Sequence, residues 1–245
     1  MEGMTQDHIE NSIVQAFNYK SNLTEDYFEQ DNQGAEVLKL LGFTSPKVKH
    51  LLNNLCNFDG CSYLELGVWA GATFCSAIYN NDIHAVAVDR FGEAASNIYP
   101  VTINSQTWQN LVGDVPIKDQ CVSNIKKYKK DNSKIQIFQS DIFEFDLNFI
   151  KEPINVFMLD CDQGADDAIH DTHFHSHIID YCKDVFADEF IFIKDDWNWT
   201  RHSTRLGLEK LTDYKIIHDI ELFTQNIEDY NDFWNGIYIA LLEKK

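Results

Sequence analysis

The chain of 245 residues is poor in positive charge, with 20 lysine and arginine residues against 39 aspartate and glutamate residues. Its formal net charge of −19 disfavours polyanionic partners, so we expect no binding to DNA, RNA or an anionic membrane. No segment approaches the roughly 18 to 20 consecutive apolar residues that a membrane-spanning helix needs. The polar and acidic residues 1–8 are unlike a secretory signal.

The sequence also has only four prolines, no Gly/Ser-rich linker and no internal repeat. Its six cysteines form no C-x-x-C pair, and most of them lie in apolar segments, where free thiols pack as small hydrophobic groups. A hydrophobic content of 44% is ample for the core of one large domain. These features predict a single domain with a small appendage in a reducing, cytoplasmic compartment.

The most informative segment of the chain is residues 62–74, S-Y-L-E-L-G-V-W-A-G-A-T-F. A strand over 62–66 runs through Glu65 into Gly67 and Gly71, and a helix over 71–80 follows. Glycines let the backbone turn sharply and approach a ligand closely, and the amides at a helix N-terminus attract polar or anionic groups. The spacing is E-x-G-x-x-x-G rather than the G-x-G-x-x-G of dinucleotide sites. Glu65 repels a diphosphate and attracts a cation, although a purely structural glycine turn is the alternative.

A second apolar run, residues 84–89, ends in Asp89. In doubly wound sheets an acid at this place binds ribose, because one carboxylate accepts hydrogen bonds from two hydroxyl groups. We expect this role for Asp89, with capping of the next segment as the alternative. The expectation does not separate NAD from S-adenosylmethionine (SAM), since both contain ribose.

Strands and helices alternate from Cys61 onward, which predicts an α/β fold. The expected strands are 62–66, 84–89, 134–138, 154–160 and 189–194, and the expected helices are 71–80, 117–131, 164–186 and 201–212. The strands are apolar at nearly every position, as in a parallel sheet buried on both faces. Two further β-like runs, 214–223 and 235–242, have no helix between them and predict an antiparallel strand at the sheet edge. Residues 1–57 read as a helical N-terminal cap on a domain formed by 58–245.

Carboxylates follow two of the expected strands. Asp160 and Asp162 end the strand 154–160, and Asp195 and Asp196 end the strand 189–194. In a parallel sheet these ends share one edge with Glu65, so the acids converge there. Several neighbouring carboxylates need compensation, and Mg²⁺ with oxygen ligands supplies it. Capping of the following helices is the alternative.

The glycine motif and the strand-end acids resemble the class I SAM-dependent methyltransferases, over roughly residues 58–245. The resemblance implies a doubly wound, mostly parallel, Rossmann-like sheet with an antiparallel last strand. It implies a cofactor site made by Glu65, Gly67, Gly71, Asp89, Ser140 and Asp141. In this site the glycine turn holds the methionine end of SAM, Asp89 the ribose and Asp141 the adenine.

Within that superfamily the chain looks like the metal-dependent O-methyltransferases of the macrocin and catechol types. This resemblance implies that Asp160, Asp195 and Asp196 hold Mg²⁺, with Asp162 as an additional candidate ligand. The metal would lower the pKa of an acceptor hydroxyl. Catechol-type enzymes place a lysine three residues after the first metal aspartate, whereas this chain has Gln163, so the general base is unassigned.

Candidates for the base are His170, His173 and Lys194. His170 and His173 belong to a run with His175 and His177. On one helix, histidines at this spacing are compatible with a base, with a zinc site or with a simple solvated face. The long insertion at about 91–115 is either a lid over the ligand edge or a surface elaboration.

We therefore predict an enzyme that transfers a methyl group from SAM to an oxygen of a small molecule, such as a sugar or a polyhydroxylated compound, with Mg²⁺ assistance. A homo-oligomer is compatible with the sequence. Two other classes stay open: a nicotinamide-dependent oxidoreductase on the same kind of sheet, and a catalytically silent methyltransferase fold that acts as a binding subunit.

Overall fold

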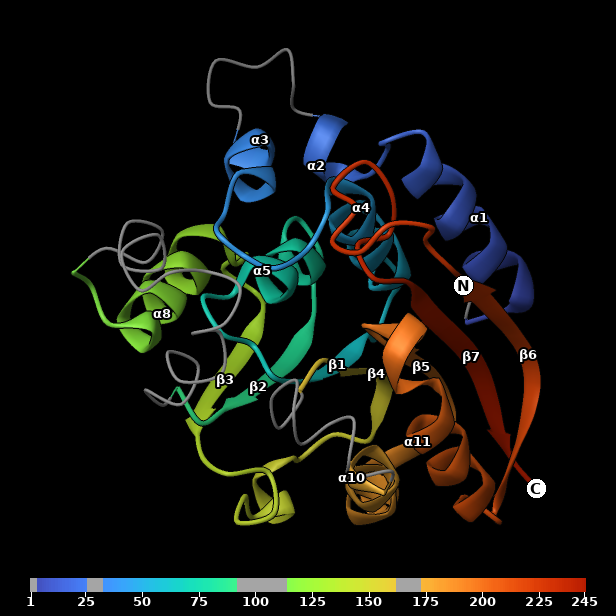
Figure 1. The fold of residues 1–245 in the computed structure, drawn as a ribbon. Coiled ribbons are helices and arrows are strands. Elements are labelled where there is room, and N and C mark those ends of the chain that lie inside the picture. The colour runs from blue at the N-terminus through green and yellow to red at the C-terminus, as the bar shows by residue number, and fades with distance from the viewer. Residues whose placement is uncertain (1–3, 26–32, 92–113, 162–172) are drawn as a thin grey trace.

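The computed structural model describes residues 4–25, 33–91, 114–161 and 173–245. They form a seven-stranded sheet of order β3-β2-β1-β4-β5-β7-β6, covered by helices on both faces (Figure 1). The strands are β1 Ser62–Leu66, β2 His84–Asp89, β3 Lys134–Gln139, β4 Ile154–Leu159, β5 Phe186–Lys194, β6 Tyr214–Leu222 and β7 Ile237–Lys244. Strands β1 to β5 pair in parallel, and β7 is antiparallel to both β5 and β6. The predicted fold class is confirmed.

The central strands are buried along nearly their whole length, which explains their apolar sequences. All five residues of β1 are buried, as are the middle four of β2 and the last five of β5. The edge strands β3 and β6 show exposed residues along their length, whereas those of β5 and β7 are confined to residues 188–189 and 243–244. Side chains alternate between the two faces of each strand, so the sheet divides the core into two hydrophobic clusters.

One face of the sheet carries the N-terminal helices together with two later ones. These are α1 Gln6–Phe17, α2 Asn22–Glu25, α3 Gln33–Leu38, α4 Pro46–Leu55, α5 Ala72–Ile78 and α8 Ile117–Tyr128. The side chains of Thr5 and Ser45 cap α1 and α4 by accepting hydrogen bonds from backbone amides. Ile9 and Leu51 lie in the same cluster as Tyr63 of β1, so the N-terminal helices share the core of the sheet.

The opposite face carries α10 Phe174–Cys182 and α11 Trp197–Lys210 (Figure 1). The predicted helix over 164–186 is wrong at its C-terminal end. A short 3₁₀ turn covers Lys183–Val185, and Phe186 already begins β5 because its ring packs on Phe190 and Phe157. The helix predicted over 201–212 begins earlier, at Trp197.

Two expectations drawn from composition can be compared with the described residues. In that part of the chain no helix is long and apolar enough to cross a membrane. All six cysteines are free, and five of them are buried.

Candidate active site

The predicted acids meet at the carboxyl edge of the sheet, where the backbone ladder continues past the strand ends. The amides of Ser140, Gly67, Asp160 and Asp195 donate to the carbonyls of Asp89, Val88, Leu66 and Leu159, at 3.0, 3.0, 2.9 and 3.4 Å. Segments that are far apart in sequence are thereby joined side by side along one edge. The convergence expected from the parallel topology is present.

The alternation of side chains also puts the acids on one face of this edge. Tyr63, Met158 and Ile193 belong to the cluster on the face of α4 and α5. Residues two positions further along each strand point to the same face, which places Glu65, Asp160 and Asp195 there. Asp89 follows Ala87 of the same cluster and joins them.

Glu65 lies beneath the glycine turn and is fully buried. Its carboxyl group accepts hydrogen bonds from the hydroxyls of Tyr63 and Thr73, each at 2.5 Å. The pKa of Glu65 is raised to about 8, mainly by burial; the hydrogen bonds from the two hydroxyl groups oppose this increase, and the charges of Asp89 and Asp195 add to it. Glu65 is therefore mostly protonated at pH 7 in this structure.

The turn itself is shaped by left-handed backbone at three positions. Gly67, Trp69 and Gly71 have φ values of 89°, 46° and 85°. A Cβ atom at Gly67 would overlap the carbonyl group of Asp160, so this glycine is required both by its φ and by the close approach of β4. Trp69 adopts the same backbone region without that freedom, and its ring packs against Phe43 at a centroid distance of 5.0 Å.

Asp89 lies at the end of β2, where ribose binding was predicted, but its carboxylate is largely occupied. Oδ2 accepts from the amides of Val68 and Trp69 at 2.7 Å each, and Oδ1 accepts from the amide of Phe91 at 2.6 Å. A carboxylate offers about four lone-pair sites, so one remains for a ligand. Two simultaneous ribose hydrogen bonds do not fit this geometry.

The adenine-binding prediction falls on Ser140 and Asp141, which follow β3. The hydroxyl of Ser140 donates to the carbonyl of Asp141 at 2.9 Å. The carboxylate of Asp141 accepts from the amide of Phe143 at 2.9 Å and lies 3.5 Å from Nε of Arg90. The backbone ladder puts both residues beside Asp89, and their role in binding adenine stays a prediction.

The predicted metal ligands lie close together, but not as a metal site. Burial and the charges of Asp195 and Asp196 raise the pKa of Asp160 well above its usual range, and the charge of Lys194 only partly opposes this. Asp196 is left-handed, with φ of 53°, and its Oδ1 accepts from Nδ2 of Asn235 at 2.8 Å. Among the residues that the structure describes, no group of three or more His, Cys, Asp or Glu side chains is arranged to hold a metal. The expectation of Mg²⁺ gains no support, and Asp162 lies outside the described residues.

The base candidates are in different environments. His170 lies outside the described residues. His173 is exposed at the start of α10, with its ring 6.1 Å from that of His177. Lys194 is fully buried, and its Nζ donates to the carbonyl of Asp195 at 2.7 Å. This bond fixes the end of β5, and a role for either residue as a base stays a prediction.

One polar group near the turn was not singled out from the sequence. Thr44 is 3% exposed, and within the described residues its buried Oγ1 has no hydrogen-bond partner. Gly42 packs closely against Ala72 at the start of α5, and Phe43 packs on Trp69, so this segment lies over the glycine turn. From the sequence alone, Ser45-Pro46 indicates only a helix cap, and nothing there shows that the residue before it reaches the turn.

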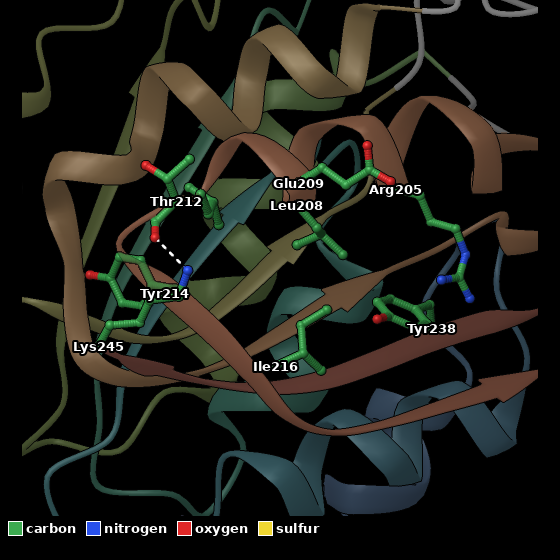
Figure 2. Close-up of a pocket in the computed structure, with 9 residues that line it drawn as sticks. Arg205, Leu208, Glu209, Thr212, Tyr214, Ile216, Tyr238 and Lys245 are labelled. Carbon is green, nitrogen blue, oxygen red and sulfur yellow. Dashed lines mark hydrogen bonds between the residues drawn. The ribbon is translucent and has the colours of Figure 1, made fainter.

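A separate cavity of about 320 Å³ lies between α11 and the strands β6 and β7, and contains none of the predicted site residues (Figure 2). Its floor is apolar, with Leu208, Ile216 and Tyr238 among its lining. The guanidinium group of Arg205 pairs with Glu221 and lies 5.9 Å from the ring centroid of Tyr238. Lys245 donates to the carbonyl of Thr212 at 2.7 Å, whereas Nε of Arg205 is buried and has no hydrogen-bond partner among the described residues.

Comparison with known proteins supports the fold. No protein-family model matches the chain, and no curated protein matches it. A solved structure of a proposed caffeoyl-CoA O-methyltransferase from Staphylococcus aureus is similar, with 12% sequence identity, a TM-score of 0.51, and coverage of 98% of this chain and 100% of that one. A proposed methyltransferase from Thermoplasma acidophilum has 15% identity and a TM-score of 0.47, with coverage of 77% and 70%. TYW2 of M. jannaschii, in complex with AdoMet, has 11% identity and a TM-score of 0.46, with coverage of 99% and 78%.

At these identities the likeness concerns the fold alone. The mixed seven-stranded sheet with its antiparallel C-terminal strand is the Rossmann-like fold of methyltransferases.

Proposed function

We propose that the protein is a SAM-dependent methyltransferase that acts on an oxygen of a hydroxylated small molecule. The observation that carries the proposal is the cluster of acidic groups around the glycine turn, in which Asp89 and Asp195 supply negative charge. Glu65 and Asp160, whose pKa values are raised in the free protein, ionise more readily when a cation binds. Glu65, Asp89, Asp160 and Asp195 lie on one face of the same edge. Such a site favours a cationic ligand, and SAM carries a sulfonium and an ammonium group. The diphosphate of a nicotinamide cofactor would be repelled.

The residues around the turn fit the parts of SAM. The turn from Gly67 to Gly71 offers backbone to the methionine end, and Asp89 has one lone pair for a ribose hydroxyl. The buried hydroxyl of Thr44 fits a polar group of the same ligand, because it lies over the turn without a partner among the described residues. Asp141 is our candidate for the adenine.

In the proposed reaction the acceptor oxygen attacks the methyl carbon in line with the breaking carbon–sulfur bond. The electron pair of that bond returns to sulfur, giving neutral sulfur in S-adenosylhomocysteine (SAH), and the acceptor loses its proton. This step requires mainly that nucleophile and sulfonium are held in position. Among the described residues the three aspartates as placed do not form a metal site.

Titration calorimetry with SAM and SAH tests the proposal directly. We expect both to bind, and their affinities to stay within about twofold when EDTA replaces Mg²⁺. Acceptors are then sought by measuring SAH formation with a panel of sugars and catechols. Absence of binding by SAM and SAH would contradict the proposal. A strong dependence of turnover on Mg²⁺ would leave methyl transfer from SAM intact and would support Mg²⁺ assistance in addition.

The two other classes give different results in the same experiments. A nicotinamide-dependent oxidoreductase would bind NADH, which a fluorescence titration detects. A catalytically silent binding subunit would bind SAM weakly or not at all, and its biological role would survive the substitution Asp195→Ala.

A further inference from the structure

The carboxylate of Asp89 is bound to the backbone of the glycine turn rather than held open toward a ligand. Its Oδ2 accepts hydrogen bonds from the consecutive backbone amides of Val68 and Trp69, and its Oδ1 accepts one from the backbone amide of Phe91. Hydrogen bonds from amides to an ionised carboxylate are stronger than those between neutral groups. Asp89 therefore joins the end of β2 to the middle of the turn.

The amides of Val68 and Trp69, which donate to Oδ2 of Asp89, belong to the part of the turn whose backbone conformation is the most strained. Trp69 is left-handed, with φ of 46°, a region that residues with a Cβ atom seldom adopt. Neighbouring groups must hold such a residue in place. Asp89 supplies two hydrogen bonds that hold it, and the packing of the Trp69 ring on Phe43 supplies a further contact.

We propose that Asp89 is a positioning residue, which holds the Val68–Trp69 backbone in the shape that receives the methionine half of SAM. This role is in addition to one hydrogen bond to ribose, and it rests on the proposed function. It predicts that Asp89 matters most for ligands that reach the turn. A residue that only bound ribose would matter equally for every ligand that contains ribose.

Two ligands separate these roles. SAH contains the amino-acid half that reaches the turn, whereas 5′-methylthioadenosine has the same ribose and adenine without it. For Asp89→Ala we expect SAH binding to weaken by about 30-fold and 5′-methylthioadenosine binding by about fivefold. Asp82→Ala is the matched control, because it removes an exposed acid just before β2, and we expect it to leave both affinities unchanged. Equal losses for the two ligands with Asp89→Ala would overturn the positioning role.

A second variant tests the link to the backbone of Trp69. Glycine adopts left-handed backbone without strain, so Trp69→Gly reduces the need for support from Asp89. In the Trp69→Gly background we expect Asp89→Ala to weaken SAH binding by less than tenfold. An undiminished 30-fold loss in that background would contradict a role through Trp69.

Amide hydrogen exchange tests the geometry without any ligand. Val68 and Trp69 donate to Asp89, so we expect their exchange to be at least tenfold faster in Asp89→Ala and unchanged in Asp82→Ala. If Asp89→Ala does not fold, Asp89→Ser serves in its place, because its hydroxyl is polar but too short to accept from the amides of Val68 and Trp69. Unchanged exchange in the folded variant overturns the inference. Failure of the wild-type protein to bind SAH, with faster exchange in the variant, overturns the proposed function and leaves the turn geometry intact.

Discussion

Two glutamates are in opposite electrostatic states: Glu65 at the carboxyl edge, and Glu221, which pairs with Arg205 of the cavity in Figure 2. Burial raises the pKa of Glu65 to about 8, and its hydrogen bonds come from hydroxyl groups. Burial alone would also raise the pKa of Glu221. However, a hydrogen bond from Trp197 and the charges of Arg205 and Arg201 bring it below its usual value.

The comparison shows that a surface cavity and a cluster of charged groups that a ligand would stabilise can lie in different places in one structure. The cavity between α11 and β6 is concave, but the guanidinium group of Arg205 in its lining already pairs with Glu221. The carboxyl edge gathers acids whose mutual repulsion a positive ligand would relieve. Our proposed site therefore rests on the electrostatics of the carboxyl edge and not on the shape of the surface.

The largest expected effect comes from a single methyl group at the edge. Gly67→Ala would force a Cβ atom into the carbonyl group of Asp160 and strain a φ of 89°. We expect SAM affinity to fall at least about 100-fold, with a loss of roughly 2–4 kcal/mol in the free energy of unfolding. Calorimetry and denaturant titration measure the two effects.

Gly60→Ala is the control for this substitution. Gly60 has a similar φ of 80°, but a Cβ atom there would meet nothing within 4 Å. The variant therefore isolates the backbone strain, and we expect it to retain SAM affinity. Full SAM binding by Gly67→Ala would contradict the proposed place of the cofactor.

Substitutions of one acid in each region sharpen the comparison. Asp195→Asn removes a charge from the edge, and we expect SAM to bind about 10-fold more weakly because less negative charge faces the cation. Glu221→Gln should leave SAM affinity within twofold. It should lower the free energy of unfolding by roughly 1 kcal/mol, because Arg205 and Arg201 lose their ionic partner and the ion pairs are partly exposed. If Glu221→Gln weakened SAM binding and Asp195→Asn did not, SAM would bind at the cavity and not at the carboxyl edge.

The sequence predicts the convergence of the acids well but not their individual environments. Glu65 and Asp160 could be placed together because the carboxyl ends of parallel strands share one edge, a consequence of topology alone. The hydrogen bonds from three amides to Asp89 depend on the left-handed backbone at Trp69. The sequence does not predict this conformation, because the residue there is not glycine. Gly42 and Phe43, next to Thr44, contact Ala72 and Trp69 through tertiary packing. Such contacts depend on tertiary packing, which hydrophobic periodicity does not encode.

The pH dependence of stability gives a smaller effect that is specific to the edge. Glu65 has a pKa of about 8 in the folded chain against 4.5 in the reference state, so between these values the folded protein binds more protons than the unfolded one. The contribution of Glu65 to stability is therefore complete below pH 4.5 and is lost as the pH rises toward 8. Its slope is at most about 1.4 kcal/mol per pH unit.

Denaturant titration of the wild-type protein and of Glu65→Gln, at several pH values, measures this slope. We expect the variant to show a flatter dependence on pH across that window. SAM should reduce the slope in the wild-type protein, because its positive charge stabilises the ionised carboxylate. Identical profiles for the two proteins would mean that Glu65 is ionised in the folded state.

The smallest expected effect on stability concerns Lys49, a buried residue of α4. Its Nζ donates to the carbonyls of Leu38 and Leu40 at 2.9 Å each, and burial lowers its pKa from 10.5 to about 8. Between pH 8 and 10.5 the unfolded chain binds more protons at this residue than the folded one, so its contribution makes stability rise with pH.

In Lys49→Met this rise should disappear, while stability at pH 7 changes by only about 1 kcal/mol. The lost hydrogen bonds to the two carbonyls oppose the gain from removing a buried charge. Comparing the wild-type protein with Lys49→Met isolates Lys49 from the cysteine and tyrosine residues that titrate in the same window. A steeper rise in the variant would show that the ammonium group is stabilised in the fold, and that its two carbonyl partners compensate for burial more fully than the hydroxyl groups around Glu65 do.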